Sequence, residues 1–458
     1  MRRRTLRPSI RRSSLRHGQI LGALALAAAG TGLAGCHSTG LGNPSDIAGR
    51  YVVTVCDADI QTGTPGSGEL GVRTLNAQDT LTVVALPISE GSTTKFAQVQ
   101  VSNSALGPPT CLAVTHDGRY AFVVEYRGPA KPEARTVDDL PPGNTVTAVD
   151  LTNPLSPTIT ATTDVVKEPI AVAVHPQGTF VAVAAQEPRR QVVILPVKNG
   201  QFAGEPAAWP LLGLDNDEAK PSSIAWHPSG NALAVTLMDR GEVMFYRFRK
   251  NDKGELQLAP WGPPVKVGKA PFAGAFTPDG RYFIVNNVES VGGVQGYDVG
   301  VPEGELVSIR MGDMPGEVGA TGGGPIQNIV VSTVKVGVGP VGMAINTAGT
   351  MLATCNVQHS HAAENIQQGG GSVSLVMLAK DGTLTNTGEF PVNAVPAGIA
   401  FDGKGSFLCV SEYRSLDPDA KDGEIGFWHI GGGSHPTLVP ADLYVAVGHG
   451  PHGVLIVR

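Results

Sequence analysis

One pattern recurs six times in the sequence: a proline, an alanine four positions later and a glycine nine positions after the proline. The spacing is the same in every copy, and a hydrophobic run follows each glycine. Such self-similarity is typical of repeat architectures, in which each copy forms one structural unit. The six copies begin at Pro109, Pro169, Pro221, Pro271, Pro340 and Pro396.

Each repeated position has a physical reason. A proline suits the start of a strand, where its missing N–H breaks no hydrogen-bond ladder. The pairs Asp117-Gly118 and Asp279-Gly280 supply the positive φ that a tight hairpin turn requires. Alanine and glycine are frequent in the first strand because innermost strands crowd around a central axis. Further hydrophobic stretches complete each copy, which predicts four antiparallel strands per unit, the composition of one β-propeller blade.

The seventh blade is split between the two ends of the chain. Residues 451–457 have the pattern of an innermost strand with nothing after it, whereas residues 49–55, 80–86 and 96–101 lack a first strand before them. Joined, these segments complete one blade and remove the exposed edges of an open array. The sequence therefore predicts an all-β, seven-bladed β-propeller over residues 49–458, closed by N- and C-terminal strands that share one blade.

The repeat resembles that of the YVTN-repeat and lactonase-like β-propellers. The nearest matches lie in residues 279–287 and 143–150, and the resemblance covers about residues 49–458. It implies the propeller fold. Proteins that resemble this chain in this way include lactone hydrolases, surface-layer proteins, binding modules and subunits of redox enzymes, so the resemblance leaves the function open.

The first 35 residues have the composition of an export signal. A basic head between Arg2 and Arg16 precedes a short apolar stretch at residues 20–29, which is too short for a transmembrane helix. Residues 11–16 also resemble a twin-arginine export signal, although a head this rich in arginine makes the match unspecific.

Residues 33–36, Leu-Ala-Gly-Cys, resemble a bacterial lipobox, which implies cleavage before Cys36 and lipid on its thiol. The alternative is an ordinary signal peptide in which Cys36 stands by chance. Residues 36–48 are expected to form a lipidated tether, which makes the membrane a partner through the lipid on Cys36. We expect an exported protein on the periplasmic face of the envelope. His37 and Ser38 favour the outer membrane over the inner one, by analogy.

Net charge and cysteine spacing argue against two features, nucleic-acid binding and a disulfide framework. The formal net charge of −6 gives no basic footprint for nucleic acid. An oxidising periplasm would permit a disulfide, but the cysteines after Cys36 lack the spacing of a disulfide framework and are better explained as ordinary strand residues. These cysteines are Cys56, Cys111, Cys355 and Cys409.

Polar side chains are predicted at one mouth of the propeller, where second strands end. Alignment of the blades on their turn glycines places Glu125, Asn287, Asn356 and Glu412 at equivalent positions, with Cys56, Ala185 and Leu237 in the other blades. The blades on either side of the split one share a tripeptide, Glu125-Tyr126-Arg127 and Glu412-Tyr413-Arg414. The split blade adds Asp57 and His452.

Two interpretations of these residues stay open. In the functional one, Glu125, Glu412 and His452 are catalytic, since lactone hydrolysis needs a general base and an oxyanion stabiliser. In the structural one, each Glu-Tyr-Arg forms a corner in which Glu and Arg pair and Tyr packs between blades. The functional interpretation assigns ligand binding to Arg127, Arg414, Tyr126, Tyr413, Asp57, Asn287 and Asn356.

A long insertion carries His359, His361 and Glu364, which could take a divalent metal; a mobile loop of this kind is otherwise solvent-exposed and unliganded. No other cofactor is predicted. The sequence contains no Cys-x-x-Cys-His haem attachment site, although a cofactor carried by a partner stays possible, and it contains no serine nucleophile elbow of the α/β-hydrolase kind.

Two functions follow. The preferred one is an envelope-anchored propeller that binds a protein, a glycan or a small ligand, because no complete catalytic set is recognisable. The alternative is a lactonase-type hydrolase that opens a lactone ring at the polar mouth.

Overall fold

A computed structural model of the whole chain describes residues 43–60, 64–70, 78–88, 94–106, 108–214, 218–289, 302–314, 327–358, 360, 370–414, 423–433 and 435–458. The predicted lipid anchor at Cys36 and the predicted metal site at His359, His361 and Glu364 fall outside the described residues.

The described residues form strands in four concentric positions. The innermost, first strands are β4 (Leu112–Val114), β8 (Pro169–Val174), β13 (Pro221–Trp226), β18 (Pro271–Phe276), β22 (Pro340–Ile345), β26 (Ala394–Phe401) and β30 (Pro451–Val457). The second strands are β5 (Tyr120–Val124), β9 (Phe180–Ala185), β14 (Ala232–Leu237), β19 (Tyr282–Asn287), β23 (Met351–Asn356), β27 (Phe407–Arg414) and β1 (Tyr51–Cys56).

The third strands are β6 (Thr145–Asp150), β10 (Val192–Lys198), β15 (Glu242–Lys250), β20 (Glu305–Arg310), β24 (Ser372–Leu378), β28 (Glu424–Gly431) and β2 (Thr80–Ala85). The outermost strands are β7 (Thr158–Asp164), β11 (Gln201–Phe202) with β12 (Ala207–Trp209), β16 (Leu256–Pro260) with β17 (Val265–Lys266), β21 (Ile329–Lys335), β25 (Leu384–Pro391), β29 (Thr437–Ala446) and β3 (Phe96–Gln100). Short helical turns are η1 (Pro44–Asp46), α1 (Thr64–Ser67), η2 (Val137–Asp139) and η3 (Met238–Arg240).

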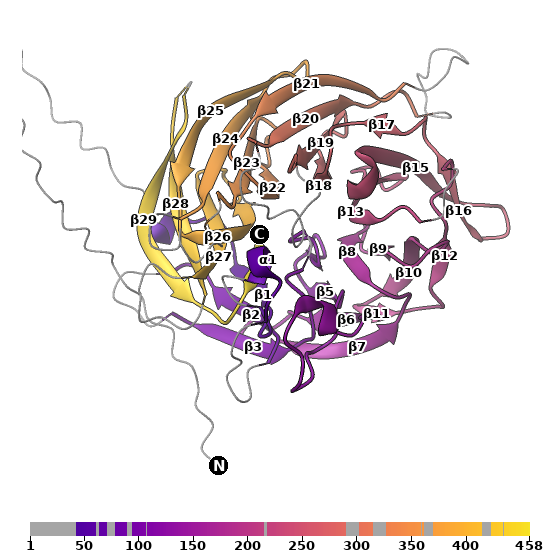
Figure 1. Cartoon of the computed structure of the whole chain (residues 1–458), viewed down its shortest axis with the longest axis horizontal. Helices are drawn as coiled ribbons and strands as arrows, with labels where there is room; N and C mark the ends of the chain where they lie inside the picture. The colour runs from indigo at the N-terminus through magenta and orange to yellow at the C-terminus, as the bar shows by residue number, and fades with distance from the viewer. Residues whose placement is uncertain are drawn as a thin grey trace, which may run out of the picture.

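These strands make seven antiparallel sheets arranged in a ring (Figure 1). Six sheets are continuous in sequence and are called here blades one to six, beginning at β4, β8, β13, β18, β22 and β26. The seventh, called the split blade, has the strand order β3-β2-β1-β30. The predicted all-β, seven-bladed propeller is therefore confirmed.

The split blade closes the ring by pairing the two ends of the described chain. Strand β30 runs antiparallel to β1, with Tyr51 opposite Val457 and Thr54 opposite Val454. The Thr54 hydroxyl also donates to the Gly453 carbonyl at 2.8 Å. Indigo and yellow strands meet at this blade in Figure 1, and the bonded residues Thr54 and Gly453 are 399 positions apart in the sequence.

The repeated proline marks a break in the first-strand ladder. Five first strands shift register just after it, as between Pro169 and Ala171 and between Pro221 and Ser223. Since proline has no N–H to donate, an irregularity there costs little. The prediction that every first strand starts at its proline was wrong in two blades, since β4 starts at Leu112 and β26 at Ala394.

The ring has two faces, which we name from their loops. The mouth face carries the ends of the second strands and the segments that lead into the first strands. The turn face carries the hairpins at the repeated glycines, such as Gly230 and Gly280. The chain joins the ring on the turn face: Ala48 N donates to the Asp402 carboxylate at 2.9 Å, and Gly403 N donates to the Ala48 carbonyl at 2.8 Å. Among the described residues, no helix has the length and apolarity needed to span a bilayer.

Candidate functional site

Two loops of the mouth face pair with each other over the split blade and blade one. Leu70 N donates to the Arg135 carbonyl at 2.8 Å, and Val137 N donates to the Gly68 carbonyl at 2.9 Å. Their apolar side chains, such as Ile60, Leu70 and Leu140, belong to the same buried cluster as the first-strand residues Ile170, Ile224 and Phe272. The loops therefore pack into the protein core and cover this part of the mouth.

A pair of carboxyl groups lies beneath these loops. Asp57 is 2% exposed and accepts hydrogen bonds from Ala105 N and Asp59 N, both at 2.8 Å. Asp79 accepts from Ala58 N at 2.9 Å and from Asn103 N at 3.1 Å. Burial raises the pKa of Asp57 well above its ordinary value, and the negative charge of Asp79 adds to the rise.

Asp79 is the more accessible of the two, since its side chain is only half-buried. Burial raises its pKa to about 7, although the two backbone N–H groups that it accepts from act in the opposite direction. A carboxyl group with a pKa near neutrality can act as a general acid or base. Asp79 was not among the residues singled out from the sequence.

His452 lies in the same region and is buried in structural hydrogen bonds. Its Nδ1–H donates to the Gly450 carbonyl at 2.8 Å, Nε2 lies 3.1 Å from Cys111 Sγ, and the backbone of Ser104 also bonds the ring. Burial lowers the pKa of His452 to about 4 and raises that of the Cys111 thiol to about 12. Both groups are therefore neutral at pH 7, and neither ring nitrogen is left over to take a proton from water.

In the first tripeptide, Glu125 contacts neighbouring hydroxyls rather than Arg127. The Glu125 carboxylate accepts from Ser102 Oγ at 2.5 Å. Arg127 pairs instead with Glu168, at 3.1 Å, and its guanidinium lies 4.9 Å from the centre of the Tyr126 ring. Tyr126 is buried and donates to Gln186 Oε1 of blade two at 3.2 Å. The tyrosine thus packs between blades as the structural interpretation expects, but the Glu–Arg pairing of that interpretation does not form here.

In the second tripeptide, Glu412 is fully buried within blade six. It accepts from Asn393 N at 2.7 Å and from Asn393 Nδ2 at 2.9 Å, and the same amide donates to Glu424 at 2.6 Å. Burial raises the pKa of Glu412 well above its ordinary value, and the neighbouring Glu424 adds to the rise. Tyr413 is buried in the core. Arg414 is the last residue of β27, and its side chain is outside the described part of the structure.

The two predicted asparagines are also fully buried. Asn287 accepts from Ala270 N at 2.8 Å, just before β18 begins, in the way that Glu412 accepts from Asn393 N just before β26. Asn356 donates to Ser372 Oγ at 2.9 Å and to Ser374 Oγ at 3.0 Å. These side chains hold the backbone that leads into a first strand, or the start of a third strand.

Sequence reasoning missed the partners that face these residues. Strand pairing places Glu412 opposite Glu424, Asn356 opposite Ser372 and Cys56 opposite Thr80, the residue after Asp79. Counting back from the hairpin register of second and third strands would have found them, since opposite residues share one face of a sheet. Among the described residues, no three His, Cys, Asp or Glu side chains are arranged to hold a metal ion.

Fold and site together define a closed seven-bladed propeller with a covered, carboxylate-rich mouth. The chain belongs to the Lactonase, 7-bladed beta-propeller family, whose model matches residues 71–415, three quarters of its length. This confirms the lactonase-like resemblance; the relation to YVTN repeats stays a prediction. No curated protein matches the chain in sequence.

Solved structures share the fold at low sequence identity. A functionally unknown protein from Desulfotomaculum acetoxidans has a TM-score of 0.57 at 14% identity, over 89% of this chain and 99% of that one. A protein from Bacteroides uniformis titled "putative 6-phosphogluconolactonase" has a TM-score of 0.54 at 14% identity, with the same coverage. A hypothetical selenium-binding protein from Sulfolobus tokodaii has a TM-score of 0.56 at 12% identity, over 90% of this chain and 96% of that one. At this identity the likeness shows the fold alone.

Proposed function

We propose that the chain is exported and works as a ligand- or protein-binding propeller on the periplasmic face of the bacterial envelope. Lipid on Cys36 anchors it there, in the outer membrane. The observation that carries the proposal is the burial and hydrogen bonding of the predicted catalytic residues. Glu412 and His452 are 0% and 2% exposed, and both are bonded to the protein's own backbone. Groups held in this way are poorly placed to meet a substrate or to exchange a proton with it.

The position of the tether supports a binding role for the mouth. Ala48 is fixed on the turn face by its bonds to Asp402 and Gly403. Six residues lie between Cys36 and Asn43, the first described residue, so the two Cα atoms can be at most about 25 Å apart. A tether that leaves from the turn face directs that face to the membrane. The mouth face then points away from the membrane, towards soluble partners.

The chemistry of the mouth favours ligands that donate hydrogen bonds. Carboxyl groups of Asp59, Asp79 and Glu125 lie near one another there, since each of the other two raises the pKa of Asp79. The nearby cation Arg127 is already paired with Glu168. Hydroxyl or ammonium groups, as on a glycan or an amine-bearing ligand, would find acceptors in these three carboxyl groups, which are half-buried.

A hydrolysis assay tests the binding role against catalysis. Purified protein would be incubated with a panel of lactones, including 6-phosphogluconolactone, with and without a chelator. We expect no turnover above background. Turnover that disappears in a folded Asp79→Asn or Glu125→Gln variant, but persists in the turn-face control Asp381→Asn, would overturn the binding proposal in favour of an enzyme.

Lipid labelling tests the anchor. Cells grown with labelled palmitate should incorporate the label into the wild-type chain, which should sediment with membranes. A Cys36→Ser variant should take up no label. Membrane association of that variant at the wild-type level would show that Cys36 is not the anchor.

One observation favours the alternative, a lactone hydrolase. Asp79 is half-buried, and its pKa of about 7 suits a general base that activates water at neutral pH. Family membership is compatible with this activity. In that case Asp79, rather than Glu412 or His452, would be the base, and the assay above would show it.

A further inference from the structure

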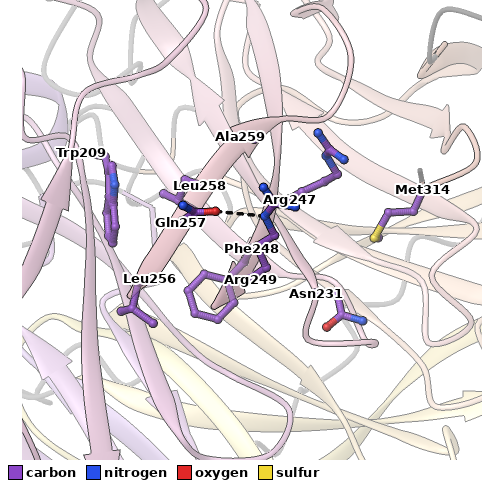
Figure 2. Close-up of a pocket in the computed structure, with 10 residues that line it drawn as sticks. All are labelled: Trp209, Asn231, Arg247, Phe248, Arg249, Leu256, Gln257, Leu258, Ala259 and Met314. Carbon is purple, nitrogen blue, oxygen red and sulfur yellow. Dashed lines mark hydrogen bonds between the residues drawn. The ribbon is translucent and has the colours of Figure 1, made fainter. Parts of the chain in front are cut away.

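A pocket of about 550 Å³ lies far from the mouth, at the outer rim of blade three. It surrounds the hairpin of β15 and β16, with Trp209 of blade two at one end and Met314, which follows blade four's third strand, at the other (Figure 2). Glu242, the first residue of β15, pairs with Leu237 at the mouth end, so residues 247–249 lie towards the turn face. The pocket and the mouth are therefore on opposite faces of the ring.

One side of the pocket is cationic because of the way β15 alternates. Val243 and Phe245 pack against residues of blade four in a buried apolar cluster. Arg247 and Arg249 continue the same row, since every second residue of a strand points to the same face. The apolar interface between blades three and four thus ends in two arginines, next to the side chain of Asn231.

The hydrogen-bond donors of these arginines are incompletely used. Arg247 Nε is buried and has no hydrogen-bond partner among the residues that the structure describes. Arg249 Nε donates to Gln257 Oε1 at 3.1 Å, which orients its guanidinium along the hairpin. A buried donor without an acceptor costs about 1–3 kcal/mol. An oxyanion in the pocket would meet the remaining N–H groups of the Arg247 guanidinium, since this residue as a whole is only half-buried.

The other side of the pocket is apolar. Phe248, Leu256 and Leu258 line it together with Trp209. Phe248 and Leu258 are directly opposite each other in the hairpin, on the face that packs towards blade two. A ligand that reaches both sides would need a negatively charged group and an apolar part.

We propose that this pocket binds an oxyanion, a phosphate or carboxylate group, through Arg247 and Arg249, with an apolar portion of the ligand against Phe248 and Trp209. Paired guanidinium groups recognise such groups by charge-assisted, bidentate hydrogen bonds. The ligand is either a soluble organic phosphate or carboxylate or the headgroup of an anionic lipid, because the turn face is also where the chain joins the ring at Ala48. The site is independent of the mouth and goes beyond the function proposed above.

The test measures binding to the full mature chain carrying Cys36→Ser, which removes only the lipid. Inorganic phosphate and hexyl phosphate would be titrated by calorimetry and by tryptophan fluorescence, which Trp209 should report. We expect hexyl phosphate to bind more tightly than inorganic phosphate, and an Arg247→Gln, Arg249→Gln double variant to bind about tenfold more weakly or worse. The matched control Arg119→Gln, which loses an exposed arginine in blade one, should bind as the wild type does.

Sedimentation with vesicles of phosphatidylglycerol or of phosphatidylcholine separates the two sources. Arginine-dependent binding to phosphatidylglycerol alone would identify a lipid headgroup. Binding of hexyl phosphate without vesicle binding would identify a soluble ligand. The proposal is overturned if neither phosphate nor either vesicle binds, or if the folded double variant binds as well as the control.

Discussion

At the scale of single residues, buried polar side chains at the mouth serve the backbone of the blades. Asn287 and Glu412, at equivalent positions, each accept a hydrogen bond from the amide just before a first strand. An amide in one blade and a carboxyl in another can do this because the bond needs only an acceptor oxygen. The same backbone amide needs an acceptor in different blades, which explains why polar residues recur at this position.

His452 gives a residue-scale prediction about pH. Its pKa is about 4 in the folded chain, below its ordinary value of 6.5, so the unfolded chain binds a proton first as the pH falls. The stability that this provides is complete above pH 6.5 and is lost towards pH 4, to the extent of about 3 kcal/mol. A His452→Asn variant should lack this loss.

Urea unfolding at pH 7.5 and at pH 4 would measure the effect in both proteins. Asp57 and Asp79 also titrate in both, so only the difference between the two pH profiles reports on His452. Equal losses of unfolding free energy in wild type and variant would contradict the prediction.

At the scale of the elements, the turn glycines connect successive blades. His175 Nε2 contacts the Gly230 carbonyl of the next blade at 3.1 Å, and His227 Nε2 contacts the Gly280 carbonyl at the same distance. Since only a donating nitrogen can bond a carbonyl, each ring carries its proton on Nε2. The hairpin of one blade is therefore tied to the histidine of the preceding one.

Substitution of Gly230 by alanine tests this connection. Gly230 has φ +76°, and a Cβ there would lie 2.4 Å from His175 Nε2. The matched control is Gly254→Ala, where φ is +80° but no atom lies within 4 Å of the new Cβ. We expect the control to lose about 1–2 kcal/mol from left-handed strain alone. Gly230→Ala should lose distinctly more unfolding free energy in urea, and equal losses would rule out a role for the histidine contact.

At the scale of the whole molecule, the ring depends on the pairing of β30 with β1. Without β30, the split blade would have no innermost strand, and β1 would present an unpaired edge. Removal of residues 451–458 should therefore abolish cooperative unfolding and expose apolar surface, as measured by urea titration and dye binding.

A permuted chain is the control for that truncation. Arg50 Nε donates to the Arg458 carbonyl at 2.7 Å, so a short linker can join residue 458 to residue 49. Residues 451–458 placed before residue 49 should restore cooperative unfolding. A truncated chain as stable as the full one would show that closure is not required.

The orientation of the ring on the membrane is a second prediction at this scale. Two variants would each carry a fluorescent donor, at Asp381→Cys on the turn face or at Pro188→Cys on the mouth face. Energy transfer from each donor to acceptor-labelled headgroups would be measured in liposomes. The four described cysteines are buried and should stay unlabelled. We expect stronger energy transfer from position 381. Stronger transfer from position 188 would reverse the orientation, whereas failure to associate with liposomes would count against lipidation itself.

The sequence by itself determined the class of fold, the number of blades and the closure. These follow from local rules: the spacing from Pro169 to Gly178 or from Pro221 to Gly230 sets each hairpin, and the missing first strand before Tyr51 requires the one at Pro451. The family resemblance, too, depended only on these repeats.

Only the tertiary structure decided what the mouth residues contact. Alignment placed Glu412 and His452 at the mouth but did not predict their contacts. Asn393 lies 19 positions before Glu412 in the same blade, and Cys111 lies in blade one, 341 positions before His452. The loops that cover Asp57 fold against the inner strands through apolar contacts that no repeat encodes. The burial and the pKa of a side chain depend on all the neighbours that the closed ring brings around it. A repeat pattern therefore predicts where these side chains lie but not which of them face water.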